Sequence, residues 1–142
     1  MRILIINGPN LNLLGKRNPE IYGNRSFESF FDDLCGRYQT DIELTYHQTN
    51  HEGQIIDWLQ DADGQFDGIV LNAGGYTHTS IAIADAIEAI QTPVVEVHIS
   101  DISKREIFRK HSFLTPVCKK TIMGLGLEGY ARAIEYFIGE KK

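Results

Sequence analysis

Short runs of apolar residues recur along the chain and alternate with stretches of helical spacing. The runs cover residues 3–6, 42–46, 68–71 and 94–99, with a weaker one at 121–123. An uninterrupted apolar run of this length is typical of a strand that is buried on both faces. The pattern therefore predicts five strands of a parallel sheet.

The stretches between these runs carry their apolar residues on one helical face. The first has Ser26 in the position of an N-cap, followed by apolar residues at helical spacing. These are Phe27, Phe30, Phe31, Leu34, Cys35 and Tyr38. Further helices are predicted around 55–62, 80–90 and 127–138.

The alternation of strands and helices indicates an α/β fold with helices on both faces of the sheet. Right-handed crossovers favour a flavodoxin-like arrangement, a five-stranded parallel sheet of order 2-1-3-4-5. Because no linker or composition shift divides the chain, residues 1–142 are expected to form a single domain.

The helix expected at 80–90 is apolar nearly all round. A helix that covers one face of a sheet needs a single apolar stripe, so the surplus favours burial against a second subunit. Asp85 would be a lone carboxylate in such an interface and would need a partner. The alternative is a helix of small residues packed tightly within one chain.

Composition and charge narrow the function classes. The 142 residues are too few for a (β/α)₈ barrel of roughly 250 residues. A net charge of −5 argues against a nucleic-acid surface but leaves room for a small cationic pocket. Cys35 and Cys118 lack metal-binding or disulfide spacing, and the apolar run after Met1 is too short for a signal peptide or a membrane span. We therefore expect a cytoplasmic protein with reduced thiols.

Polar residues follow three of the predicted strands, at 7–10, 72–80 and 98–101. The carboxyl ends of parallel strands meet at one edge, which is where α/β folds bind their ligands. Asn10 and Asn72 can equally be turn residues, the commoner role of asparagine near glycine. Taken together, the three segments predict a ligand site at this edge.

Glu96 and His98 lie two positions apart on the fourth predicted strand. Both side chains then share one face, while Val95, Val97 and Ile99 take the other. A carboxylate beside an imidazole fixes its tautomer and favours the protonated form that a general acid needs. A purely structural pair fits the same pattern.

The segment 11–25 is long for a loop in so small a domain, which is typical of a lid. Arg17 and Tyr22 lie within it, around a bend that Pro19 and Gly23 favour. A guanidinium near a phenol favours the phenolate and hence a base. Tyr22 taken alone is more typical of a packing aromatic.

The string Gly124-Leu-Gly126-Leu-Glu-Gly129 matches a dinucleotide-binding fingerprint and stands between a strand and a helix. That fingerprint needs a further strand with an acidic residue about 20 positions on, and only one helix follows here. We therefore expect these glycines to permit a tight turn and close helix packing, without a dinucleotide cofactor.

The chain resembles type II 3-dehydroquinate dehydratase over nearly its whole length. The resemblance rests on six ordered stretches, residues 6–11, 14–23, 72–80, 96–100, 105–112 and 124–130. It implies a shikimate-pathway enzyme that converts 3-dehydroquinate to 3-dehydroshikimate by anti elimination through an enolate, with no metal, cofactor or imine. Lys16 departs from the family, which often has another arginine there.

The resemblance also implies a role for each site residue. Tyr22 would remove the C2 proton, Arg17 would keep that phenol ionised, and Asn10 would hold Tyr22 and a water that stabilises the enolate. His98, paired with Glu96, would protonate the departing C1 hydroxyl.

The same resemblance implies the substrate contacts. Asn72 would support the acid, Ile99 and Ser100 would bind the substrate carboxylate, and His78 and Arg109 would hold ring hydroxyls. Asp85 would reach a neighbouring subunit's site in a homo-oligomer, a dodecamer built from trimers.

Two other classes compete with this interpretation. Type I dehydroquinase runs the same reaction through a lysine Schiff base on a barrel that this length cannot supply. The alternative is a small-anion-binding or receiver-like module of similar fold without catalysis. A receiver would need clustered acids after the first strand and an aspartate after the third to hold Mg²⁺, and Asn7 and Asn72 stand there. An FMN-binding flavodoxin would need a Ser/Thr/Gly phosphate loop in place of Asn-Gly-Pro-Asn at 7–10.

Overall fold

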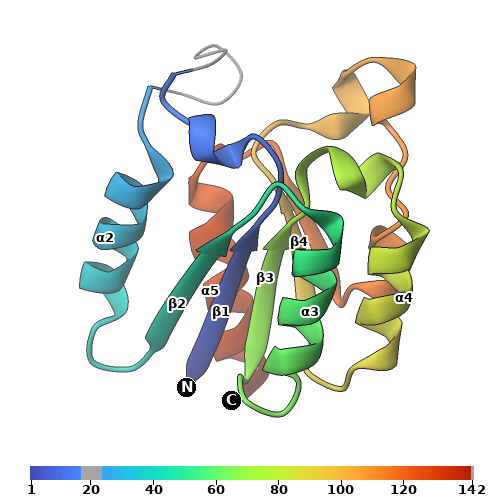
Figure 1. The fold of residues 1–142 in the computed structure, drawn as a ribbon. Helices are drawn as coiled ribbons and strands as arrows, with labels where there is room; N and C mark the ends of the chain where they lie inside the picture. Colours follow the sequence, from blue (N-terminus) through green and yellow to red (C-terminus); the bar gives the residue numbers. More distant parts are fainter. Residues whose placement is uncertain (17–23, 142) are drawn as a thin grey trace.

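The computed structural model describes residues 1–16 and 24–141, which fold around one sheet (Figure 1). Its strands are β1 (Arg2–Asn7), β2 (Glu43–Gln48), β3 (Gly68–Asn72), β4 (Val94–His98) and β5 (Lys120–Met123). Its α-helices are α2 (Phe27–Tyr38), α3 (Glu52–Ala62), α4 (Ile81–Ala89) and α5 (Glu128–Lys141). Short 3-10 turns connect them, namely η1 (Leu11–Leu13), η2 (Gly74–His78), η3 (Ile102–Lys104), η4 (Ile107–Arg109) and η5 (Thr115–Val117).

The five strands pair in parallel in the order β2-β1-β3-β4-β5, which confirms the predicted topology. The register sets Asn7 beside Asn72, so two asparagines end neighbouring strands at the same edge. It also sets Glu96 beside Leu71 on one side and Thr121 on the other. All strands therefore deliver their carboxyl ends to a single edge of the sheet.

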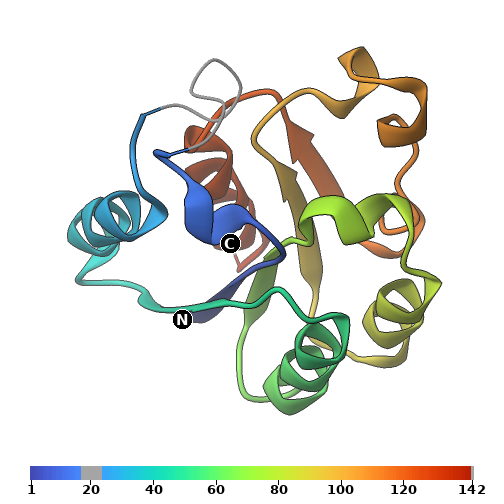
Figure 2. The same ribbon diagram turned by 45° about the horizontal axis from the view of Figure 1, so that its top comes forward.

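Helices cover both faces of the sheet, α2 and α5 on one and α3 and α4 on the other (Figure 2). The α2/α5 layer is built from aromatic and branched side chains, including Phe27, Phe30, Tyr130 and Phe137 against Ile5, Val70 and Val97. The α3/α4 layer packs Ile55, Leu59, Ile83 and Ile87 against Leu4, Ile6 and Leu71. Alternate side chains of each central strand enter opposite layers, and this is why the strands are apolar without a break.

Helix starts follow local capping chemistry. The Ser26 hydroxyl accepts a hydrogen bond from the Ser29 N–H at 3.2 Å, as the sequence predicts for the start of α2. Ser80 caps α4 in the same way and also donates to Glu52 at the start of α3. These contacts fix where the helices leave the edge that carries the polar residues.

The surplus apolar residues of α4 lie on its outer surface within one chain. Ile81 is 59% exposed, and Ala82, Asp85 and Ala89 are exposed beside it, whereas Ile83 and Ile87 are buried. The outer face of α4, which was expected to be buried as well, is therefore exposed in a single chain. Its burial against another subunit stays a prediction.

The glycine string before α5 forms a turn. Gly124 and Gly126 have φ angles of 80° and 62°, which side chains disfavour, and a Cβ on Gly129 would lie 3.3 Å from Val97 Cγ1. The predicted tight turn and close packing of the last helix are confirmed. Among the described helices, none has the length and apolar character needed to cross a membrane.

Candidate active site

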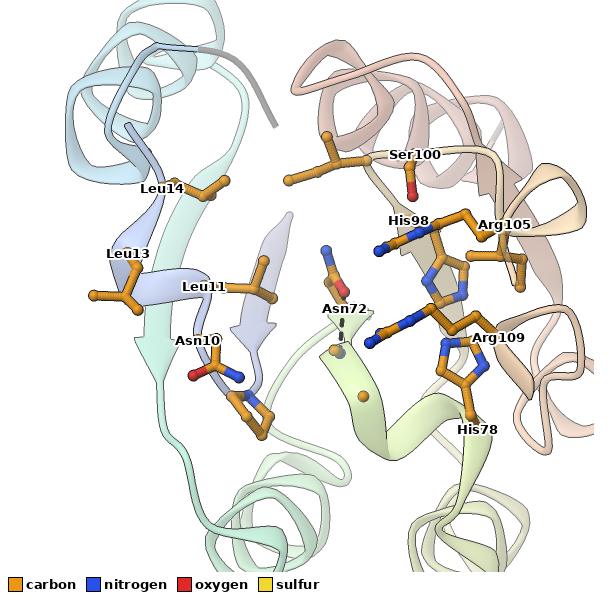
Figure 3. Close-up of a pocket in the computed structure, with 15 residues that line it drawn as sticks. Asn10, Leu11, Leu13, Leu14, Asn72, His78, His98, Ser100, Arg105 and Arg109 are labelled. Atoms are coloured by element: carbon orange, nitrogen blue, oxygen red, sulfur yellow. Dashed lines mark hydrogen bonds between the residues drawn. The ribbon is translucent and has the colours of Figure 1, made fainter. Parts of the chain in front are cut away.

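A pocket of about 270 Å³ opens at the carboxyl edge of the sheet. Figure 3 shows two walls, one carrying Asn10, Leu11, Leu13 and Leu14 and the other carrying His78, His98, Arg105 and Arg109. Asn72 lies between them at the end of β3. The pocket thus gathers the segments that follow β1, β3 and β4, as the sequence predicts.

The Glu96–His98 pair forms the buried centre of the second wall. His98 Nε2 lies 2.5 Å from Glu96 Oε2, and the two side chains are 5% and 0% exposed. A carboxylate can only accept a hydrogen bond, so Nε2 carries a proton and Nδ1 is the ring nitrogen left for a ligand. The predicted pairing on one face of β4 is confirmed.

Three hydroxyl groups surround the same carboxylate. Ser112 donates to Oε2 at 2.6 Å, and Thr115 and Thr121 each donate to Oε1 at 2.7 Å. Burial alone would raise the pKa of Glu96, but the His98 contact and the hydroxyl hydrogen bonds outweigh it and lower that pKa to about 2. Glu96 is therefore a carboxylate at neutral pH although its side chain is fully buried.

Asn72 is held by a second buried network. Its Oδ1 accepts from the Gly74 N–H at 3.1 Å, and its Nδ2 donates to the Tyr130 hydroxyl at 2.9 Å. Tyr130 in turn donates to Asn7 Oδ1 at 2.7 Å. Burial raises the pKa of Tyr130, so the phenol stays protonated and bridges the two asparagines. Support of His98 by Asn72 stays a prediction.

The opposite wall is built differently. Asn10 has a φ of 70°, so its role as a turn residue is confirmed, and it also lines the pocket. Its N–H donates to Asn50 Oδ1 at 3.1 Å. Leu11 and Leu14 are buried and attach this part of the predicted lid to the core, while Leu13 is 38% exposed.

The remaining described candidates reach the pocket from the segments after β3 and β4. His78 Nδ1 donates to the His111 carbonyl at 2.8 Å, which leaves Nε2 for a ligand. Ile99 and Ser100 line the pocket, and their carbonyls accept from Gly126 and Gly124. The glycine turn therefore fixes the backbone beside the pocket.

Two arginines line the pocket, and only one was assigned a role from the sequence. Arg109 pairs with Glu106 at 3.1 Å and lies over the Phe108 ring at 4.9 Å. Arg105, the extended residue that ends η3, lines the same pocket. The available signal was its place in the stretch 105–112, one of the six that carry the resemblance. The two arginines form the small cationic pocket that the negative net charge did not exclude.

Of the predicted residues that the structure describes, Glu96 and Asp85 do not line the pocket, and Glu96 is fully buried against His98. Arg17 and Tyr22 lie outside the described residues. Asp85 stands exposed on the outer face of α4 and does not line the pocket within one chain. Among residues 1–16 and 24–141, no group of three or more His, Cys, Asp or Glu side chains is arranged to hold a metal ion.

This arrangement suits a small anionic, hydroxylated ligand. Arginines and backbone groups can bind a carboxylate, the amides of Asn10 and Asn72 can bind hydroxyls, and an imidazole backed by a carboxylate can transfer a proton. At the end of β1, Asn7 and Gly8 stand where a dinucleotide-binding fold has its glycine-rich phosphate-binding loop.

Comparison with known proteins gives a consistent result. A family model described as "Dehydroquinase class II" matches residues 1–138. The chain is 52% identical over 138 residues to a 3-dehydroquinate dehydratase of Bacillus pumilus, covering 96% of this chain and 94% of that protein. It is 54% identical over 138 residues to one of an Exiguobacterium species, covering 97% and 94%. The crystal structure of a type II dehydroquinase from Butyrivibrio crossotus superimposes with a TM-score of 0.94 at 46% identity, covering 97% of each chain.

Proposed function

The chain belongs to the class II dehydroquinase family, and on that premise we propose that it converts 3-dehydroquinate to 3-dehydroshikimate by anti elimination of water through an enolate. The reaction would serve the shikimate pathway in the cytoplasm. The observation that carries the proposal is the buried Glu96–His98 pair in a pocket that also presents two arginines.

His98 is the general acid of the proposed reaction. Glu96 holds Nε2, so the proton that leaves with the C1 hydroxyl comes from Nδ1 of the imidazolium. The buried negative charge of Glu96 stabilises this imidazolium before the reaction and needs no rearrangement during it.

Tyr22 is the base that removes the C2 proton, and Arg17 keeps its phenol ionised. Both belong to the segment between Lys16 and Asn24, and the described flanks of that segment meet next to the pocket wall. A Cβ on Gly15 would lie 3.1 Å from the Asn24 carbonyl oxygen, and Leu14 lines the pocket just before it. This geometry supports a loop that starts and ends beside the ligand.

The other contacts hold the substrate between acid and base. The backbone amides of Ile99 and Ser100, with the Ser100 hydroxyl, bind the carboxylate. His78 and Arg109 bind ring hydroxyls, and Asn72 supports His98 and contacts the substrate. Asn10 holds Tyr22 and the water that stabilises the enolate. Their convergence on one pocket, Tyr22 aside, supports these roles.

The enzyme assembles as a homo-oligomer, a dodecamer of trimers, in which Asp85 reaches a neighbouring site. The support is the apolar surface that a single chain leaves open. Ile81, Phe108 and Ile107 are 59%, 67% and 84% exposed, and Asp85 stands among the exposed residues of α4.

Ultraviolet absorbance tests the reaction directly, because the product is a conjugated enone and the substrate is not. Purified protein mixed with 3-dehydroquinate should show rising enone absorbance without added metal or cofactor. A protein that binds the substrate but never forms the enone would instead be a binding module. Covalent trapping of substrate on a lysine by borohydride would refute the metal-free enolate route in favour of an imine.

Tyr22→Phe tests the base. Removing the only ionisable atom of a general base lowers kcat by about 10² to 10⁴-fold, while assembly mass and circular dichroism stay unchanged. A variant with near-normal turnover would exclude Tyr22 from this role.

A further inference from the structure

The carboxylate of Glu96 has a complete set of hydrogen-bond donors, two for each oxygen. Oε2 accepts from His98 Nε2 and the Ser112 hydroxyl, and Oε1 accepts from the Thr115 and Thr121 hydroxyls. A carboxylate offers about four lone-pair sites, so this one has no acceptor site left.

The hydroxyls reach Glu96 from parts of the chain that are remote in sequence. Thr121 is the register partner of Glu96 on the edge strand β5, and Thr115 begins η5. Ser112 stands in the turn before it, where its oxygen accepts from the backbone N–H groups of Leu114 and Thr115 at 3.1 Å each. With both acceptor sites of Ser112 used, its single proton can only point to Glu96.

A buried imidazole–carboxylate pair that shares one proton has two arrangements. The proton lies on the imidazole, giving an ion pair, or on the carboxylate, giving two neutral groups. A low-dielectric site favours the neutral arrangement, since it avoids two buried charges. Each hydroxyl that donates to the carboxylate stabilises its ionised form and shifts the balance back to the ion pair.

We propose that Ser112, Thr115 and Thr121 are positioning residues that hold the shared proton of the Glu96–His98 pair on His98. They do not touch substrate. They keep the general acid charged by making Glu96 too weak a base to take its proton. The proposal rests on the proposed function for its catalytic consequence, but the position of the proton is a property of the free protein.

Other ionisable groups around the pair do not compete for this proton. Cys118 lies near Glu96, and burial, with a smaller contribution from the Glu96 charge, raises the pKa of its thiol to about 12. Arg105, Arg109 and His78 line the pocket beside His98 (Figure 3). Glu106 pairs with the two arginines, at 3.9 and 3.1 Å. The positive charge of the two guanidinium groups opposes the imidazolium, which makes the ionised state of Glu96 more necessary.

The test uses the double variant Thr115→Val/Thr121→Val, which keeps shape and removes both protons from Oε1. Thr115→Ser/Thr121→Ser keeps the hydroxyls and serves as the rescue. Thr45→Val on β2, the opposite edge strand, is the matched control for loss of a strand threonine hydroxyl. Infrared spectra of the free proteins report the carbonyl stretch of a protonated carboxyl group, and steady-state kinetics give kcat and KM.

The double Val variant should show a protonated-carboxyl band that is absent from the wild type and disappears when Glu96→Gln is added. Its kcat should fall about tenfold or more with KM unchanged, because a hydrogen bond to a charged group is worth about one tenfold factor or more. The Ser variant and Thr45→Val should resemble the wild type in both measurements.

A double Val variant without the band, and with kcat within about twofold of Thr45→Val, would overturn the proposal. If that variant does not fold, Thr121→Val alone is measured against the same two criteria. A wild type that forms no enone would refute the proposed function, whereas the infrared measurement would still decide where the proton lies.

Discussion

Two buried polar clusters lie beneath the pocket, on opposite faces of the sheet, and they differ in charge. The charged cluster is Glu96, His98, Ser112, Thr115 and Thr121, and the neutral cluster is Asn7, Asn72 and Tyr130. Glu96 pairs in register with Leu71, which belongs to the α3/α4 layer, whereas Tyr130 belongs to the α2/α5 layer. The neighbouring strands β3 and β4 thus direct a neutral cluster into one layer and a charged cluster into the other.

The clusters also differ in how completely their atoms are bonded. Every acceptor site of Glu96 has a donor, but Asn7 Nδ2 is buried without a hydrogen bond to any part of the chain that the structure describes. A buried charge without hydrogen-bond partners costs far more free energy than a buried amide without them. Only the charged cluster therefore needs a donor at every acceptor site. The charged cluster sets a protonation state, and the neutral one sets the position of Asn72.

Replacing the charge should produce the largest effect. Glu96→Gln presents an amide N–H₂ to neighbours that are donors and removes the counter-charge of the imidazolium. We expect kcat to fall about 10²-fold or more and the basic limb of the pH–rate profile to move to lower pH. Urea unfolding should show a loss of about 3 kcal/mol, the usual result of breaking a buried pair. Unchanged kcat with lowered stability would make the pair structural.

Low pH should remove the stabilisation that the ionised Glu96 side chain gives the wild-type protein. The pKa of Glu96 is lowered from 4.5 to about 2, so its contribution is fully present above pH 4.5 and is lost as pH falls toward 2. A shift of this size corresponds to about 3 kcal/mol. The difference in unfolding free energy between wild type and Glu96→Gln should shrink by that amount across this interval. A constant difference would mean that Glu96 is not specially stabilised as a carboxylate.

The sequence predicted the two clusters to different extents. Period-two alternation on one strand was enough to place Glu96 and His98 together, because both residues belong to β4. Ser112, Thr115 and Thr121 lie 16, 19 and 25 residues from Glu96 and reach it only through tertiary docking. Helical spacing predicted the helix around 127–138 that carries Tyr130, but not the direction of the Tyr130 hydroxyl.

The residues of the pocket were likewise predicted only in part from the sequence. The strand-end rule predicted that Asn10, Asn72, His78 and His98 share one edge, and they do. It did not predict Arg105, because the irregular segment from η3 to η5 has no periodic pattern that fixes which side chains turn inward. The sequence offered Arg17 and Tyr22 as a possible cation and base, the resemblance gave them their roles, and these roles stay predictions.

Removing the bridge of the neutral cluster should have a smaller effect. Tyr130→Phe leaves Asn7 Oδ1 and Asn72 Nδ2 without their shared partner and should lower the unfolding free energy by about 2 kcal/mol. Because Asn72 would be less well placed, KM should rise by about tenfold or less while kcat and the pH–rate profile stay in place. A shifted profile would mean that the neutral cluster also controls protonation.

The smallest effect should come from a pair of glycines on α5. Gly139 has open space around its Cβ position, so Gly139→Ala should stabilise the helix by about 0.5 kcal/mol. At Gly129 a Cβ would lie 3.3 Å from Val97 Cγ1 and 3.6 Å from Ile122 Cγ2. Both neighbours belong to strands and can move little. The close contacts of the new Cβ should therefore outweigh the gain in helix propensity, so that Gly129→Ala lowers the free energy of unfolding by less than about 1 kcal/mol.

The two glycine variants also test whether the function of the neutral cluster depends on the position of α5. Gly129 directly precedes Tyr130, so pushing α5 away from β4 moves the phenol relative to Asn7 and Asn72. KM should therefore rise slightly in Gly129→Ala and not in Gly139→Ala, with the pH–rate profile of both unchanged. If urea unfolding and KM were equal in the two variants, Asn72 would keep its place without a fixed helix behind it. The neutral cluster would then lose its positional role, and the charged cluster alone would connect the buried core to the chemistry of the pocket.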